Sequence, residues 1–174
     1  MDKKKALKGL VVCLVIMMLL PALVTYLFDP FYQYHQPFFN LKASLYDRDN
    51  QVAGTIRSFD YDSVLLGSSV AENFDSAFLD EQLGCKTLKV IRASSSVADL
   101  LYYMEMAHKN QEIKNVFWCL DIFALTSPTE ITLKDKSIPR YLHTDTILDD
   151  VTYLFNKDII FKEIPRSVSY SLQN

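Results

Sequence analysis

The longest feature of the hydrophobic pattern is an apolar segment near the N-terminus. Nineteen residues without a charge run from Leu10 to Phe28, and lysines at positions 3, 4, 5 and 8 precede them. As a helix the segment would be about 28 Å long, close to the hydrocarbon thickness of a bilayer, and the positive-inside rule keeps its basic end in the cytoplasm. Residues 1–28 are therefore predicted to be a basic tip and a single-pass signal anchor. The anchor would contact the lipid bilayer through residues 10–28 and leave the C-terminal domain extracellular.

Two other interpretations of this segment stay open. One is a cleaved signal peptide, although its apolar part is usually about 7–15 residues long and no clear A-x-A cleavage site follows here. The other is a buried core helix, but such a helix shows an amphipathic period that this run lacks. We therefore expect the signal anchor.

The rest of the chain divides at about Tyr61. Residues 29–60 contain Pro30, Pro37 and many aromatic side chains, and we expect them to form a juxtamembrane connector. Residues 61–174 have a regular pattern and are expected to form one α/β domain.

Within residues 61–174, short apolar runs alternate with helical patterns. Three runs predict buried strands, at residues 63–67, 87–91 and 115–120. Asp75 and Gly84 are the cap residues typical of a helix over Ser76–Leu83, and the triplet Ser94–Ser96 can cap a second helix. Because strands and helices alternate with short connections, we expect parallel strands with right-handed crossovers.

After Asp121 the pattern is weaker. Residues 122–144 are expected to be a long loop, residues 145–155 a helix, and residues 156–174 one more short helix and a polar end. Three strands are few for a domain of this class, so the domain over residues 61–174 is expected to be incomplete.

Composition changes this picture in two ways. The chain has 174 residues and a formal net charge of −3, and residues 29–174 carry 14 basic and 20 acidic residues, so no nucleic-acid partner is expected. Cys13 lies in the apolar segment, while Cys85 and Cys119 are expected to be buried free thiols, with a disulfide between them as the alternative. No spacing typical of a metal site occurs, and neither a metal nor another cofactor is expected.

Small and polar residues follow each predicted strand. Gly67 ends the first strand and Ser68 and Ser69 follow it. Ser94–Ser96 come after the second strand and Asp121 after the third. Sites in open α/β sheets form at the carboxyl ends of the strands, so we expect these residues to share one crevice. Backbone N–H groups on such a turn can bind an oxyanion. Plain structural roles stay open, as a strand-to-helix turn and a helix N-cap.

Residues 61–74, with the sequence Tyr-Asp-Ser-Val-Leu-Leu-Gly-Ser-Ser-Val-Ala-Glu-Asn-Phe, resemble the first conserved block of SGNH/GDSL-type hydrolases. The variant without the Asp of Gly-Asp-Ser is similar to membrane-anchored relatives of cell-envelope acyl transfer, such as the teichoic-acid D-alanylation and alginate O-acetylation proteins. Residues 29–31 and 156–158 also resemble a group of Gram-positive bacterial membrane proteins with this domain. The resemblance covers about residues 25–165 and implies a partial flavodoxin-like, three-layer αβα fold with a short parallel sheet.

The resemblance also implies roles for the residues at the strand ends. Ser69 matches the nucleophile, and Ser68 takes the position of the missing Asp. The turn at Ser95 matches the second block, where the backbone N–H of a Gly usually joins the oxyanion hole. Asp121 lies where the third block usually offers an Asn donor, and its carboxylate would repel an oxyanion.

The family's late Asp-x-x-His pair, which supplies the acid and the base, has no match here. None of the three histidines has an Asp three residues before it, and they are His35, His108 and His143. The resemblance implies an extracytoplasmic esterase or acyltransferase that acts on acyl esters of cell-envelope glycans or polymers, with its histidine outside this chain. The alternative is a non-catalytic SGNH-like module that binds an envelope polymer or a membrane partner. A third possibility is a structural partner of a membrane-bound acyltransferase.

Overall fold

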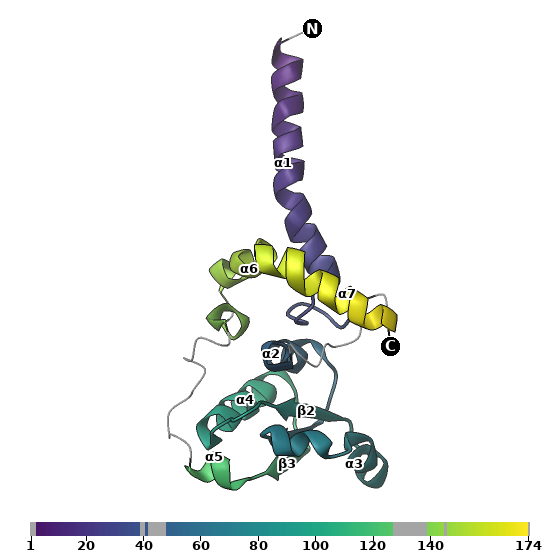
Figure 1. Cartoon of the computed structure of the whole chain (residues 1–174), viewed down its shortest axis with the longest axis vertical. Coiled ribbons are helices and arrows are strands. Elements are labelled where there is room, and N and C mark those ends of the chain that lie inside the picture. Colours follow the sequence, from purple (N-terminus) through teal and green to yellow (C-terminus); the bar gives the residue numbers. More distant parts are fainter. Residues whose placement is uncertain (1–2, 39–40, 42–47, 127–138, 145, 174) are drawn as a thin grey trace.

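The computed structural model describes residues 3–38, 41, 48–126, 139–144 and 146–173. Its longest element is an N-terminal helix of 26 residues. Helix α1 (Lys3–Phe28) extends away from the other elements over most of its length, and only its C-terminal end contacts them (Figure 1). Only 6% of its most apolar stretch is buried, so α1 is not a core helix. Its length and composition are those of a membrane span or a signal segment, as the sequence predicts.

The predicted parallel sheet is confirmed. It consists of β1 (Ser63–Gly67), β2 (Thr87–Ile91) and β3 (Asn115–Cys119), in the order β2-β1-β3. Leu65 in the central strand lies opposite Lys89 and Phe117. All three carboxyl ends therefore lie at one edge of the sheet, which we call the carboxyl edge.

The predicted helix caps are confirmed as well. The Asp75 side chain accepts a hydrogen bond from the backbone N–H of Ala77 (2.9 Å) and caps α3 (Ser76–Leu83). Gly84 ends this helix with φ 62°, a left-handed conformation that suits glycine. Ser96 and Asp99 form a capping box at the start of α4 (Val97–Asn110).

The two faces of the sheet are covered differently. Val64 and Leu66 face α4 and α2 (Arg48–Ser58), and they form the main core with Ile56 and Tyr103. Helix α2 lies in the expected connector, where the sequence pattern predicts no helix. Leu65 and its neighbours face α3, where an open apolar hollow of about 300 Å³ remains.

A second group of helices lies at the C-terminal end of α1 (Figure 1). We call this group, with the turn that follows α1, the collar (residues 29–38, 139–144 and 146–173). Its helical elements are η4 (Arg140–Leu142), α6 (Ile147–Leu154), η5 (Ile159–Glu163) and α7 (Ile164–Gln173). A short helix, α5 (Ile122–Thr126), follows β3, so the expected loop over residues 122–144 is partly helical. Residues 127–138 of that loop lie outside the described residues.

The collar is held by the carboxylate of Asp29, the first residue after α1. Both of its oxygens accept hydrogen bonds, from the backbone N–H groups of Gln33 (2.9 Å), Tyr34 (2.7 Å) and His35 (3.2 Å). The buried hydroxyl of Tyr153 in α6 donates a further bond of 2.7 Å. Burial raises the pKa of Asp29, and these hydrogen bonds partly oppose the shift.

The turn after α1 also touches α2 directly. A side chain at Gly54 would place its Cβ 1.9 Å from the carbonyl oxygen of Phe31, so this contact needs glycine. The backbone of the collar therefore packs directly on the backbone of α2 at Gly54, where there is no room for the methyl group of an alanine.

We expect Asp29→Asn to lower the free energy of unfolding by about 2 kcal/mol, because the amide nitrogen replaces an oxygen that accepts backbone hydrogen bonds. Asparagine tolerates the φ of 33° at this position, so the loss reports the carboxylate. Denaturant unfolding of the full chain in detergent measures it. The control, Asp60→Asn, changes a carboxylate that is 73% exposed. Equal losses for both variants would contradict this role of Asp29.

Candidate functional site

The carboxyl edge brings together the ends of β1 and β3. The hydroxyl of Ser68 donates a hydrogen bond to Oδ2 of Asp121, and it accepts one from the backbone N–H of Val70 (3.3 Å). Oδ1 of Asp121 accepts from the backbone N–H of Ala124 (2.7 Å) at the start of α5. Both carboxylate oxygens are thus engaged, and Asp121 ties two strand ends together.

Ser69 stands beside this pair, as the first residue of η2 (Ser69–Asn73), and is exposed to solvent. Gly67 precedes the turn, and a Cβ there would lie 2.4 Å from that of Ala71. The turn is therefore as tight as the sequence suggests. It presents the hydroxyl of Ser69 outward, while Ser68 points inward and is buried.

The serine triplet lies at the same edge. The backbone N–H of Arg92, at the end of β2, donates to the carbonyl of Gly67 (3.2 Å). Ser94 adopts φ 53°, and Ser96 is the N-cap of α4, as the structural interpretation of the triplet predicts. Ser95 is buried, and its hydroxyl has no partner within the described part of the chain.

The histidines lie elsewhere, and all three are among the described residues. His35 is in the collar, where Nε2 lies 2.6 Å from the carbonyl oxygen of Tyr26. His108 is exposed near the C-terminal end of α4, which runs back toward the amino ends of the strands. Neither can reach Ser69.

His143 is buried against the outer side of α4. Its ring lies 5.8 Å from that of Tyr103 between ring centroids, and its carbonyl accepts from the hydroxyl of Tyr102 (3.1 Å). Tyr103 packs on the sheet face of Val64, whereas η2 lies on the other face, since Lys89 of that face donates to the carbonyl of Glu72. The core therefore separates His143 from Ser69.

Burial and the nearby charges of Arg57 and Arg92 lower the pKa of His143 to about 4. Neither ring nitrogen has a hydrogen-bond partner among the described residues. His143 is thus a neutral, buried imidazole in the wall of a cavity of about 380 Å³, together with Arg57 and Lys109.

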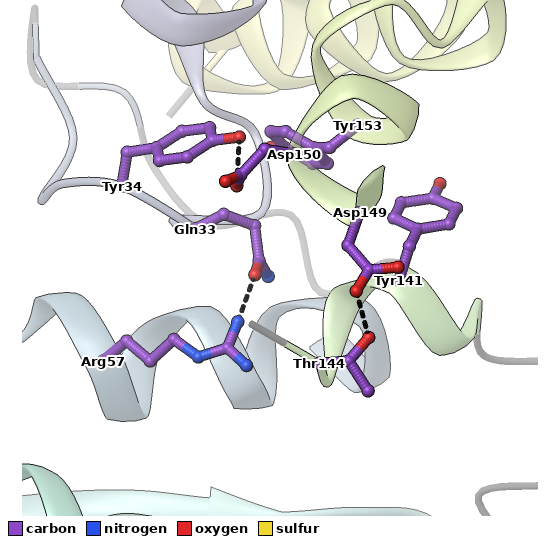
Figure 2. Close-up of a pocket in the computed structure, with 8 residues that line it drawn as sticks. All are labelled: Gln33, Tyr34, Arg57, Tyr141, Thr144, Asp149, Asp150 and Tyr153. Carbon is purple, nitrogen blue, oxygen red and sulfur yellow. Dashed lines mark hydrogen bonds between the residues drawn. The ribbon is translucent and has the colours of Figure 1, made fainter. Parts of the chain in front are cut away.

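A second polar cavity, of about 270 Å³, lies between the collar and α2. Figure 2 shows Arg57 of α2 reaching Gln33, with a distance of 2.7 Å between Nη1 and Oε1. Asp150 accepts from the hydroxyl of Tyr34 (3.0 Å), and Asp149 from the hydroxyl of Thr144 (2.6 Å). Local sequence patterns do not reveal this cavity, because its walls come from residues about 120 positions apart.

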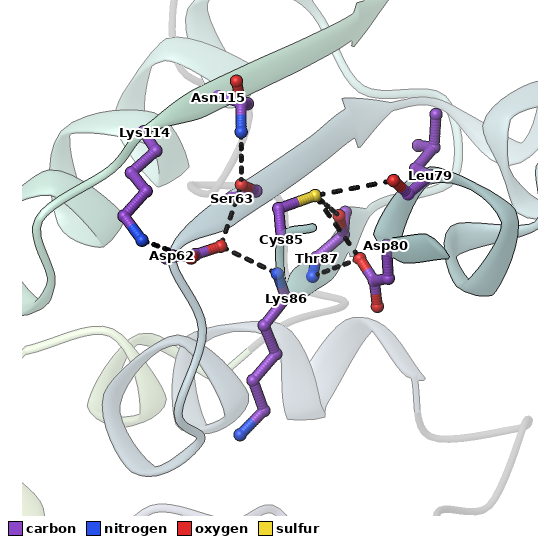
Figure 3. Close-up of polar contacts among 9 residues, drawn as sticks. All are labelled: Asp62, Ser63, Leu79, Asp80, Cys85, Lys86, Thr87, Lys114 and Asn115. Atoms are coloured by element: carbon purple, nitrogen blue, oxygen red, sulfur yellow. Dashed lines mark hydrogen bonds and ion pairs between the residues drawn. The ribbon is translucent and has the colours of Figure 1, made fainter. Parts of the chain in front are cut away.

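The amino ends of the strands carry a different polar cluster (Figure 3). Asp62 accepts from the backbone N–H of Lys86 (2.8 Å) and from Nζ of Lys114 (2.9 Å). These bonds lower the pKa of Asp62 to about 2. The cluster ties β1 to the starts of β2 and β3, and its donors and acceptors satisfy one another.

The cysteines are free thiols, as expected, but Cys85 and Cys119 are half-buried and not buried. Cys85 precedes β2 at the amino ends of the strands, where its sulfur lies 3.7 Å from the carbonyl oxygen of Leu79. Cys119 ends β3 at the opposite edge, so the alternative of a disulfide is excluded. In the part of the chain that the structure describes, no group of three His, Cys, Asp or Glu residues could hold a metal ion.

Comparisons with known proteins found no relative of this chain. No protein-family model matches the chain, and no curated protein or solved structure matches it. The resemblance to SGNH/GDSL-type hydrolases therefore rests on the residues of the chain itself, above all on residues 61–74.

We expect stability to fall in mild acid because of His143. The unfolded chain binds a proton at this residue near pH 6.5, whereas the folded protein resists protonation until about pH 4. The contribution is fully present above pH 6.5 and is lost as the pH falls, by about 2 kcal/mol between about pH 7.5 and pH 5. In His143→Gln this part of the pH dependence should disappear, and in His108→Gln it should remain. Denaturant unfolding at both pH values measures it, and an unchanged pH dependence in His143→Gln would refute the assignment.

Proposed function

We propose that the chain is a membrane-anchored, extracytoplasmic SGNH-like module that binds an envelope polymer or a membrane partner at its carboxyl edge without hydrolysing it. The basic tip, the apolar length of α1 and the acidic remainder support a signal anchor with the α/β layers outside the cell. The parallel sheet and its flanking helices support a partial flavodoxin-like, three-layer arrangement.

The observation that carries this proposal is the chemistry around Ser69. A serine hydroxyl is a poor nucleophile at neutral pH unless a base takes its proton. No histidine of the chain lies at the carboxyl edge, and the carboxylate of Asp121 is engaged by Ser68 and by the start of α5. An acidic group at this position also disfavours an oxyanion beside it. Ser69 is therefore suited to donate a hydrogen bond to a bound ligand or to accept one from it.

A second candidate function is an esterase or acyltransferase that acts on acyl esters of envelope glycans or polymers. The observation in its favour is the exposed Ser69 on a tight turn next to the serine triplet, in the arrangement that the resemblance implies. In this case a histidine from another source would have to act as the base, and Ser95 would mark the oxyanion turn.

A serine-reactive fluorophosphonate distinguishes the two functions. We expect the full chain, in native membranes, to label no more than Ser69→Ala does, because no base activates the hydroxyl. Ser169→Ala, which removes an exposed serine of α7, is the matched control. Labelling that Ser69→Ala abolishes and Ser169→Ala preserves would refute the non-catalytic module and support the enzyme.

Binding at the carboxyl edge is tested by placing a large side chain at position 69. Because Ser69 is exposed, Ser69→Tyr should leave the fold intact but weaken binding to isolated, acylated envelope polymer or to a co-purified membrane partner by about tenfold. Ser169→Tyr should bind as the unchanged protein does. Equal binding by both variants would remove the carboxyl edge as the binding site.

A further inference from the structure

Helix α6 has an apolar face that the described chain leaves uncovered. Ile147 and Leu148 are 82% and 77% exposed, and Val151 and Phe155 are also exposed. With Leu154, these side chains recur at helical spacing and occupy one side of α6. The opposite side carries Tyr153, which is buried in the collar. An exposed apolar face of this size is typical of a surface that contacts another apolar partner.

The apolar face of α6 is continuous with the surface of α1. Leu154 closes an apolar groove of about 490 Å³ in the corner between the two helices, whose other walls are Ile16, Leu19, Leu20, Ala22, Leu23 and Tyr26. The α1 side of this groove belongs to the segment with the length of a membrane span. Lipid that surrounds α1 would therefore reach α6 without crossing any polar surface.

A buried hydrogen bond fixes the position of α6 relative to the C-terminal end of α1. Tyr153 donates to Asp29, which directly follows the last residue of α1. In Figure 1, α6 lies beside the lower end of α1 at this level. The end of an apolar span marks the boundary between hydrocarbon and headgroups, so α6 lies at that boundary. Asp149 and Asp150 engage Thr144 and Tyr34 of the collar, on the side away from the apolar face.

We propose that α6 is an interfacial helix whose apolar face is embedded in the outer leaflet of the bilayer, with acyl chains in the groove beside α1. This inference rests on the proposed membrane anchor. The occupant is lipid, because the groove continues onto the lipid-facing side of α1 and because a helix with one apolar and one polar side binds in the plane of the interface. The collar thus holds the α/β layers at a set height and orientation above the membrane.

The test places a single tryptophan at chosen positions of the full chain, reconstituted in phosphatidylcholine vesicles that contain brominated lipids. Trp118→Phe removes the one native tryptophan. Leu148→Trp then reports α6, Val15→Trp reports α1, and Leu101→Trp, at an exposed position of α4, is the matched control. We expect lipid brominated near the headgroups to quench Leu148→Trp at least about twofold more than Leu101→Trp.

The outcomes separate the two claims. Quenching of Val15→Trp by lipid brominated in mid-chain, together with quenching of Leu148→Trp, supports both the anchor and the interfacial helix. Quenching of Val15→Trp with Leu148→Trp no more quenched than Leu101→Trp overturns the interfacial helix alone and leaves its apolar face to a protein partner. Absence of quenching at Val15→Trp overturns the anchor and this inference together.

Discussion

The buried carboxylate of Asp29 is the interaction on which the arrangement of this protein depends. It gathers three backbone N–H groups of the turn after α1 and the hydroxyl of Tyr153 from α6. A buried acid is costly unless its oxygens are hydrogen-bonded, so each donor is needed to keep the others in place. This one side chain links the end of α1, the turn that contacts α2 at Gly54, and α6.

Local signals in the sequence predict the α/β layers well. The three strands and the caps at Asp75, Gly84 and Ser96 follow from patterns within a few residues. The carboxyl edge follows too, because parallel strands with short crossovers must end at one side of the sheet. Ser68 and Asp121 do meet there, but the carboxylate engages Ser68, so that of the two serines in the turn after β1 only Ser69 is exposed.

Contacts between distant segments could not be predicted in the same way. Helix α2 has a weak apolar period, and its place is set by glycine contact with the turn after α1 and by packing on α4. Asp149 and Asp150 are two consecutive acids in a predicted helix, and the structure shows that they line a cavity with Tyr34 and Arg57. His143 lies in a loop by its sequence context, and only the fold shows that aromatic rings bury it. Such side chains acquire their surroundings from elements that no local window contains.

The bond between Tyr153 and Asp29 joins residues that are 124 positions apart. A ribosome adds about 5–20 residues per second, so the carboxylate leaves it on the order of ten seconds before its partner hydroxyl exists. During that interval the turn after α1 lacks the hydrogen bond from Tyr153, and the strands and α4 can already pack together, since all of them are synthesised earlier than α6. The contact between α6 and the turn after α1 is therefore made after the α/β layers can form.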